Sequence, residues 1–254
     1  MRSAWAVLLI SAMASGTSLA ADPPSNNVGS PGDSWRSIAR LPDWSGVWEL
    51  DWRSSFTGAA LVDKKLPQLT PRYAASFAKY QAAQTRGEEE QTEQANCVPP
   101  GMPGIMTQPY PIEFLFTPGK VTIAIEAYSQ MRRVFTDGRT HPADPDPTFA
   151  GHSVGHWEGD TLVVDTVGVL PGTSLAPGIQ HSSQLRIEER IRRISDDTLQ
   201  IHTTFRDPEA LAEPWQVVRT YVRHRDWDIK EYVCTQNNRD SADSQGRAGI
   251  NIER

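Results

Sequence analysis

Residues 157–166 of this chain read WEGDTLVVDT, and this stretch decides the fold class. Glu158, Gly159 and Asp160 form a polar turn, and the β-branched run from Thr161 to Val167 follows it. Another strand-forming run, Ser153 to Trp157, precedes the turn. Two such runs joined by a short glycine-containing turn are typical of a β-hairpin.

The same pattern of short strands and polar turns recurs on either side of this hairpin. The expected strands cover residues 41–51, 112–117, 121–128, 131–135, 153–157, 161–167, 184–194, 198–206, 216–224 and 227–236. A series of this kind predicts an all-β fold, specifically a lipocalin-like antiparallel meander barrel. Thr70 followed by Pro71 is a helix start, so one peripheral helix is expected over about 71–94.

Composition divides the 254 residues into four parts. Met1 to Ala20 has a positive start, a short apolar core and a small-residue cleavage site, which together indicate a secretory signal peptide. Residues 21–40 read as a flexible leader, 41–236 as a single β-barrel domain and 237–254 as a polar tail. The apolar run of the signal is too short to span a bilayer. The expected protein is therefore periplasmic or secreted, and no membrane partner is expected.

Charge and cysteine usage narrow the class further. A formal net charge of −6 argues against nucleic acid and anionic membrane surfaces as partners. The chain has two cysteines, Cys97 and Cys234. In an oxidising compartment such a pair is most simply one disulfide, and two buried free thiols are the alternative. The oligomeric state stays open.

Several segments, taken in order, resemble a family of exported bacterial proteins of uncharacterised function. They are CVPPGMPG (97–104), QPYPIEFLFTPG (108–119), RRVFTDGRTHP (132–142), GHSVGHWEGDTLVVDTVG (151–168) and EYVCTQNNRD (231–240). The resemblance implies an exported, β-rich protein and brings no function with it. The motif GVW at 46–48 is also similar to the start of lipocalin-type barrels.

Strand alternation places four carboxylates on the apolar side of their strands: Glu126, Asp165, Glu189 and Glu231. A buried carboxylate either pairs with a cation or has a raised pKa. Arg132, Arg133 and Arg139 are natural partners for these groups. The carboxylates would then line a polar cavity or form structural ion pairs, and a strand bulge would instead turn them to water.

The loop after Asp137 carries the candidate catalytic residues. His141 at the rim of a barrel can act as a general base when a nearby carboxylate holds it. In this hypothesis Arg139 stabilises developing negative charge, and Asp165 or Glu189 is the acid or the orienting group. The alternative is that Asp137 belongs to an ordinary turn and that His141 is exposed.

A second set of residues is the candidate lining of a ligand pocket: Asp137, His181, Tyr128, Trp157 and Tyr232. The aromatic members are core packing by default, and they also suit a flat apolar or sugar-like ligand. His181 opens a loop of its own and could meet His141 across the rim of the barrel.

His152 and His156 are four residues apart, a spacing that binds zinc well on a helix. Gly151 and Gly155 predict strand or turn here, so a metal site is the less favoured interpretation. GHSVG around Ser153 matches the G-x-S-x-G motif of a nucleophile elbow, but no helix is expected after it, so a serine hydrolase is not expected. Because neither dinucleotide-binding nor P-loop motifs occur, no cofactor is expected.

Two functions from different classes remain. The first is a periplasmic protein that binds a small apolar or aromatic molecule in the mouth of the barrel. The second is a cofactor-free lyase, isomerase or hydratase that uses the same pocket, with His141 as the base. Loss of His141 would stop turnover in the enzyme and would leave the binder nearly unchanged. A third possibility, a structural envelope protein, predicts no pocket.

Overall fold

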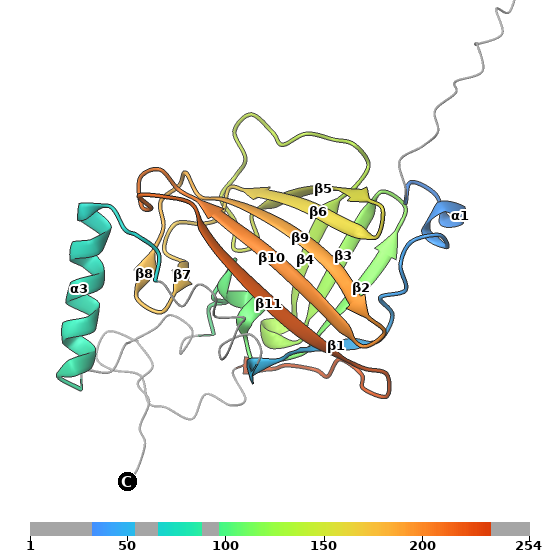
Figure 1. Ribbon diagram of the computed structural model, residues 1–254, viewed down its shortest axis with the longest axis horizontal. Coiled ribbons are helices and arrows are strands. Elements are labelled where there is room, and N and C mark those ends of the chain that lie inside the picture. The colour runs from blue at the N-terminus through green and yellow to red at the C-terminus, as the bar shows by residue number, and fades with distance from the viewer. Residues whose placement is uncertain (1–31, 54–65, 88–96, 235–254) are drawn as a thin grey trace, which may run out of the picture.

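The computed structural model describes residues 32–53, 66–87 and 97–234, and their strands close into a barrel (Figure 1). The barrel strands are β1 (Val47–Leu50), β2 (Ile112–Thr117), β3 (Lys120–Ile125), β4 (Gln130–Phe135), β5 (His152–Glu158), β6 (Thr161–Val167), β9 (Arg186–Ser195), β10 (Thr198–Arg206) and β11 (Trp215–His224). Strand β1 pairs with both β2 and β11 and so closes the barrel. The all-β barrel prediction is confirmed, while the predicted signal peptide and polar tail lie outside the described residues.

The hairpin predicted from WEGDTLVVDT is β5–β6, with Gly159 at a φ of +62° in its turn. A second glycine, Gly155, lets two strands approach closely. A Cβ at this position would lie 2.8 Å from the Val163 carbonyl oxygen and 2.9 Å from Val134 Cγ1. Such contacts are too short for any side chain, so glycine is required where β5 packs beside β4.

One strand pair departs from the predicted antiparallel meander. Strands β4 and β5 are parallel, and the other pairs in the barrel are antiparallel. Parallel neighbours need a long connection that returns to the starting end. Residues 136–151 make this return as a loop outside the barrel, seen at the top of Figure 1. Pro142, Pro145 and Pro147 in this loop lack the N–H donors that strand pairing requires.

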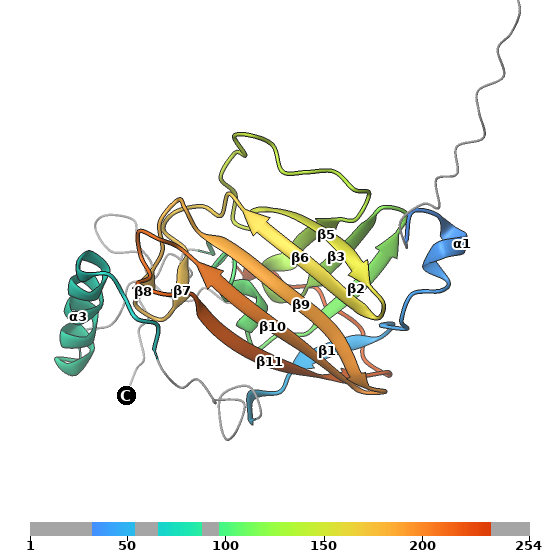
Figure 2. The ribbon, with the colours of Figure 1, turned by 45° about the horizontal axis from the view of Figure 1, so that its top comes forward.

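The peripheral helix α3 (Pro71–Thr85) begins where it was predicted to begin, with Pro71 at the first position. It ends before the predicted limit near residue 94, because Gly87 follows at a φ of +72°. Figure 2 shows the helix beside a small ribbon, β7 (Ser174–Ala176) and β8 (Ile179–Gln180). The Tyr80 ring contacts Gly178 so closely that a Cβ there would be 2.1 Å from Tyr80 Cδ1.

Two segments differ from the sequence-based expectation at the ends of the described chain. The predicted flexible leader contains a short helix, α1 (Trp35–Ile38), capped by Ser34. The predicted strand over 227–236 is wrong for residues 227–234, because β11 ends at His224 and no strand occurs in residues 225–234, while 235 and 236 lie outside the described residues. Glu231 is consequently exposed and does not face the barrel interior.

The predicted interior position of Glu126 is also wrong. Strand β3 ends at Ile125, and the short 3₁₀ helix η4 (Ala127–Ser129) follows it. Tyr128 and Ser129 have φ values of +56° and +49°, which a strand cannot contain. The Glu126 carboxylate therefore lies outside the barrel, where it accepts a 2.8 Å hydrogen bond from the Lys230 amide.

The two ends of the barrel interior differ in character. An aromatic cluster fills the end near α1, and it consists of Trp44, Phe114, Phe116 and Trp157. The Trp44 ring lies 5.0 Å from Phe114 and 5.2 Å from Trp157, so this end is closed by tight aromatic packing. The opposite end, beside β7, contains polar side chains and the candidate site.

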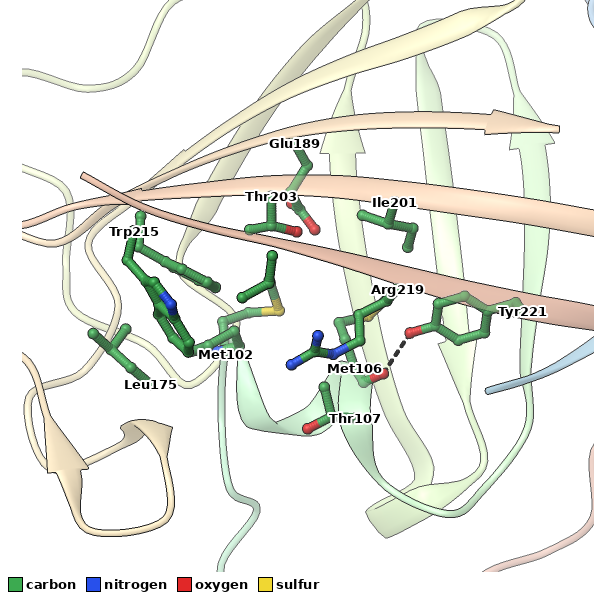
Figure 3. Close-up of a pocket in the computed structure, with 13 residues that line it drawn as sticks. Met102, Met106, Thr107, Leu175, Glu189, Ile201, Thr203, Trp215, Arg219 and Tyr221 are labelled. Carbon is green, nitrogen blue, oxygen red and sulfur yellow. Dashed lines mark hydrogen bonds between the residues drawn. The ribbon is translucent and has the colours of Figure 1, made fainter. Parts of the chain in front are cut away.

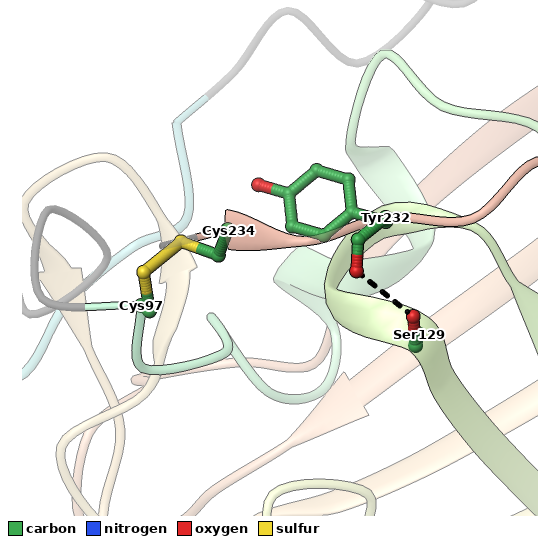
Figure 4. Close-up of a disulfide and its surroundings, with 4 residues drawn as sticks. All are labelled: Cys97, Ser129, Tyr232 and Cys234. Atoms are coloured by element: carbon green, nitrogen blue, oxygen red, sulfur yellow. Dashed lines mark hydrogen bonds between the residues drawn. A yellow bond between two sulfur atoms is a disulfide. The ribbon is translucent and has the colours of Figure 1, made fainter. Parts of the chain in front are cut away.

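The predicted disulfide is present (Figure 4). Cys97 and Cys234 are bonded with their Cα atoms 5.6 Å apart. The bond joins the segment before the 3₁₀ helix η3 (Gly104–Thr107) to the segment after β11. None of the helices in the described part of the chain is both long and apolar enough to cross a membrane.

Candidate functional site

A buried ion pair lies inside the barrel. Arg132 from β4 donates from Nη1 to Glu189 Oε1 at 3.1 Å and from Nη2 to Oε2. The two residues are only 1% and 3% exposed. Thr166 accepts another hydrogen bond from Arg132 Nη2 at 3.0 Å. Glu189 thus faces the interior, as its place on the apolar side of its strand predicts, and Arg132 is its partner.

A pocket next to this ion pair opens at the same end of the barrel (Figure 3). Its lining residues are Met102, Pro103, Met106, Thr107, Leu175, Glu189, Ile201, Thr203, Phe205, Trp215, Val217, Arg219 and Tyr221. The walls are mostly apolar, and η3 with the segment before it supplies four of the lining residues: Met102, Pro103, Met106 and Thr107. The cavity volume is about 30 Å³, which holds roughly two water molecules and is too small for a larger ligand.

Two polar residues of β11 reach into this pocket. Tyr221 donates its hydroxyl hydrogen to the Met106 carbonyl oxygen, and burial raises the pKa of the Tyr221 phenol. Arg219 donates to the Val218 carbonyl oxygen at 3.3 Å, and burial lowers the pKa of its guanidinium. Figure 3 shows the Arg219 guanidinium directed toward the segment from Met102 to Thr107.

Asp165 lies on the outer face of the barrel, so its predicted interior position is wrong. It does share a face with Val163 and Val167, but the least exposed residues of β6, at 0–1%, are Leu162, Val164 and Thr166 on the opposite face. The error has a physical cause: both faces of this strand are apolar, and alternation alone cannot tell them apart. The returning loop 136–151 partly covers the outer face.

A chain of polar contacts surrounds Asp165 there. His141 Nε2 lies 3.0 Å from Asp165 Oδ2, and His141 Nδ1 lies 2.8 Å from His152 Nδ1. Arg186 donates from Nε and Nη2 to the same carboxylate, both at 2.7 Å. One of the two facing Nδ1 atoms must donate to the other, so a hydrogen bond joins the two imidazoles. His141 and Asp165 are therefore brought together as predicted, but on the outside of the barrel.

Arg139 and Asp137 lie in the same outer region. Arg139 Nε donates to the Asp137 carboxylate at 2.9 Å, and its guanidinium carbon lies 3.9 Å from the centre of the Phe135 ring. Phe135 in turn stacks on His152 with ring centres 5.5 Å apart. Of the four candidate catalytic residues, only Glu189 lines the barrel pocket.

The remaining candidate ligand residues are dispersed. Trp157 packs in the aromatic cluster at the far end of the barrel. Tyr128 and Tyr232 pack together near the disulfide, where burial raises the pKa of Tyr232 to about 12. His181 is buried, with Nε2 2.7 Å from Thr173 Oγ1 and Nδ1 2.7 Å from the Ser182 carbonyl oxygen, so neither ring nitrogen is directed to His141. None of these residues lines the barrel pocket.

His181 does line a second, wider crevice between α3 and β8, with a volume of about 190 Å³. The other residues of this crevice are Arg72, Tyr73, Ser76, Gly172 and Gln180. Arg72 is 79% exposed and is bonded to Glu209 at 2.8 Å. Because its cation is solvated and already paired, this crevice is a weaker candidate than the barrel interior despite its volume.

The metal interpretation gains no support. His152 pairs with His141, whereas the exposed His156 pairs with Glu158 at 3.1 Å. Within the ranges that the structure describes, no group of three or more His, Cys, Asp or Glu side chains could hold a metal ion.

Several pocket residues were missed by sequence reasoning. Strand alternation could have predicted that Arg219 faces the pocket, because Val217, Arg219 and Tyr221 alternate along β11 and share its inner face. No sequence pattern predicts the position of Met102 and Met106, because they belong to an irregular Pro- and Gly-rich segment that lines the pocket only in the folded protein.

These features define a class of protein: a closed β-barrel with an aromatic-filled end and a small, partly polar pocket at the other. No protein-family model matches the chain, and a search of curated proteins finds none that is significantly similar. The resemblance to exported bacterial proteins therefore stays a prediction, and function has to be inferred from the pocket.

Acid should destabilise the fold through two histidines. Burial lowers the pKa of His181, and burial together with His141 lowers the pKa of His152. In the unfolded chain a histidine has a pKa of about 6.5, so below this pH the unfolded state binds more protons. Stability from both groups is present above about pH 6.5 and is lost as the pH falls toward their folded-state values.

Urea denaturation at about pH 7.5 and about pH 5 measures this loss. The loss should be smaller in His181→Gln and in His152→Gln than in the unaltered protein. His202→Gln, at an exposed position on β10, is the matched control and should leave the pH dependence unchanged. Equal pH dependence in all four proteins would contradict the assignment.

Proposed function

We propose that this protein binds a small molecule with a largely apolar or aromatic body inside the barrel, in the periplasm of the exporting cell. The observation that carries the proposal is the pocket beside the buried Arg132–Glu189 pair. Its apolar walls provide the contact area, and its few polar groups provide orientation, which is the usual make-up of a ligand site. The signal-like N-terminus and the disulfide support the compartment.

Two flexible side chains in the lining make this small pocket compatible with ligand binding. Met102 and Met106 line the pocket, and each methionine has three rotatable side-chain bonds. Small-molecule sites have volumes of roughly 300 Å³ or more, so the cavity of about 30 Å³ has to widen to admit a ligand. We infer that a ligand enters by displacing these two side chains without moving the barrel strands.

The alternative, an enzyme with His141 as the base in the barrel pocket, is less well supported. It places a His–carboxylate pair and the ligand in one pocket, but His141 and Asp165 are separated from the barrel pocket by the wall of the barrel. The specific observation in its favour is the 2.8 Å contact of His141 with His152, which resembles a proton relay. Such an enzyme would have to use the outer face, where His141→Ala would abolish turnover.

Fluorescence of N-phenylnaphthylamine, a neutral aromatic probe that brightens in apolar surroundings, tests the proposed binding. The unaltered protein should bind it saturably. Thr203→Phe, which fills the pocket, should weaken binding by at least tenfold. The neighbouring Thr204 points away from the pocket, so Thr204→Phe is the matched control and should bind normally. Near-ultraviolet circular dichroism checks that each variant folds.

Absence of saturable binding by the unaltered protein would contradict the proposal. So would equal weakening by both threonine replacements, because the site would then lie outside the barrel. Leu175→Phe fills the pocket from the β7 side and replaces Thr203→Phe if that variant does not fold.

A further inference from the structure

A short chain of polar contacts links the crevice beside α3 to a residue that lines the barrel pocket. His181 is 5% exposed and lines this crevice, whose volume is about 190 Å³. Its Nε2 lies 2.7 Å from Thr173 Oγ1. The same hydroxyl oxygen lies 3.1 Å from the carbonyl oxygen of Met102, a lining residue of the pocket. The hydroxyl of Thr173 therefore connects the imidazole to the main chain of the pocket lining.

The hydrogen positions in this chain follow from its donors and acceptors. His181 Nδ1 lies 2.7 Å from the Ser182 carbonyl oxygen, which can only accept, so Nδ1 carries a hydrogen. Burial lowers the pKa of His181, so at about pH 7 the ring is neutral and Nε2 is an acceptor. Thr173 has a single hydroxyl hydrogen, and its shortest contact directs this hydrogen to Nε2. The Met102 carbonyl oxygen does not receive it in this state.

Protonation of His181 reverses the direction of its bond to Thr173. Nε2 gains a hydrogen from solvent through the crevice and becomes a donor to Thr173 Oγ1. The hydroxyl hydrogen then turns to a carbonyl oxygen, of which Met102 at 3.1 Å is nearer than Leu170 at 3.2 Å. The Met102 amide already donates to the Phe149 carbonyl oxygen at 2.7 Å. With His181 protonated, Met102 is thus held through both its N–H and its C=O groups.

Other charged side chains near His181 are already paired. The Asp207 carboxylate raises the pKa of His181 against the larger effect of burial, and it accepts hydrogen bonds from the amide and hydroxyl of the residue that follows His181. Across the crevice, Arg72 is bonded to Glu209 at 2.8 Å, and burial raises the pKa of the Tyr73 phenol. Histidine is the side-chain type that ordinarily titrates between about pH 5 and pH 8, so the imidazole is the group expected to respond.

Resting on the proposed function, we propose that His181 and Thr173 form a proton-operated latch on the barrel pocket. While His181 is neutral, the segment that carries Met102 can shift, and the pocket can widen for a ligand. When His181 is protonated, the Thr173 hydroxyl holds the Met102 carbonyl group, and the pocket stays small. Ligand affinity should therefore fall as His181 takes up its proton.

Nuclear magnetic resonance of the ligand-free protein tests the latch without any ligand. In a titration from about pH 8 to about pH 5, the Met102 methyl signal should move with the same midpoint as the ring signals of His181. The exposed Met131 is an internal control and should not follow them. Thr173→Val keeps the shape of the side chain and removes its hydroxyl. In this variant His181 should still titrate, and the Met102 signal should no longer follow it.

Fluorescence titration with N-phenylnaphthylamine tests the consequence for binding. This diarylamine is a very weak base and stays neutral throughout, so a pH dependence of its affinity belongs to the protein. Affinity should be about fivefold lower with His181 protonated than at about pH 7.5, which is the factor that one hydrogen bond contributes.

His181→Gln cannot take up the proton and should bind the probe equally at both pH values. His152→Gln is the matched control, because it removes another histidine whose pKa is lowered, on the outer face of the barrel. This control should keep the pH dependence of binding. Near-ultraviolet circular dichroism checks that each protein is folded at both pH values.

The outcomes separate the latch from the proposed function. A Met102 signal that ignores the titration of His181, or still follows it in Thr173→Val, would overturn the latch. So would a His181 ring that stays neutral until the protein unfolds. If the probe binds equally at both pH values, the proposed function stands and the latch fails. If the probe does not bind at about pH 7.5, the proposed function fails, and the Met102 signal alone decides whether the latch exists.

Discussion

Replacing Glu189 with leucine should lower the free energy of unfolding by about 3–5 kcal/mol, because the change leaves the Arg132 guanidinium charged in the barrel interior without its partner. Arg132 is 1% exposed, so water cannot compensate for the lost carboxylate. Thr166 still accepts a hydrogen bond from Arg132, but a neutral hydroxyl cannot balance the charge. Urea denaturation followed by tryptophan fluorescence measures the change.

Two further variants make this prediction specific. Glu188 is the adjacent residue of β9, and its ion pair with Arg206 is solvated. Glu188→Leu should cost less than about 1 kcal/mol, as exposed pairs do. The double replacement Arg132→Met with Glu189→Leu should recover most of the lost stability, because no unpaired charge is left inside. Equal losses for Glu189→Leu and Glu188→Leu would contradict the buried pair.

Replacing both cysteines with serine should lower the free energy of unfolding by about 5 kcal/mol. The bond closes a loop with a sequence separation of 137 residues. By the chain-entropy argument, a loop of this length restricts the unfolded chain more than a short loop does. Urea denaturation of the unaltered protein and of the Cys97→Ser, Cys234→Ser double variant measures the difference.

Reduction of the unaltered protein is an independent route to the same state and should give the same midpoint as the double variant. Each single cysteine replacement should equal the double variant, because one cysteine alone cannot form the bond. A double variant within 1 kcal/mol of the unaltered protein would mean that the link contributes far less than about 5 kcal/mol.

Strand β9 shows why part of the site could be predicted from sequence. Its inner residues Ile187 and Ile191 alternate with the charged Arg190 and Arg192, so the two faces differ strongly. Alternation therefore assigns Glu189 to the interior correctly. In β6 both faces are apolar, because one faces the interior and the other lies under the loop 136–151. The same rule then fails for Asp165, although the strand itself was predicted correctly.

The contacts that could not be predicted are those made by distant segments. His152 meets His141 only because the loop after β4 returns along the barrel and makes β5 parallel to β4. Turn-forming residues predict that a loop exists but not its path. Met106 reaches the pocket for a similar reason, since Tyr221 of the distant strand β11 donates its hydroxyl hydrogen to the Met106 carbonyl oxygen.

The central claim, that a ligand enters the barrel beneath the methionine-bearing segment, is tested most directly by nuclear magnetic resonance of methionine methyl groups. From residue 21 onward the chain has three methionines: Met102, Met106 and Met131. Met102 and Met106 line the pocket, and the exposed Met131 is an internal control. Titration with N-phenylnaphthylamine should shift the Met102 and Met106 signals and leave Met131 unchanged. Binding that leaves Met102 and Met106 unshifted would place the ligand elsewhere and contradict the account.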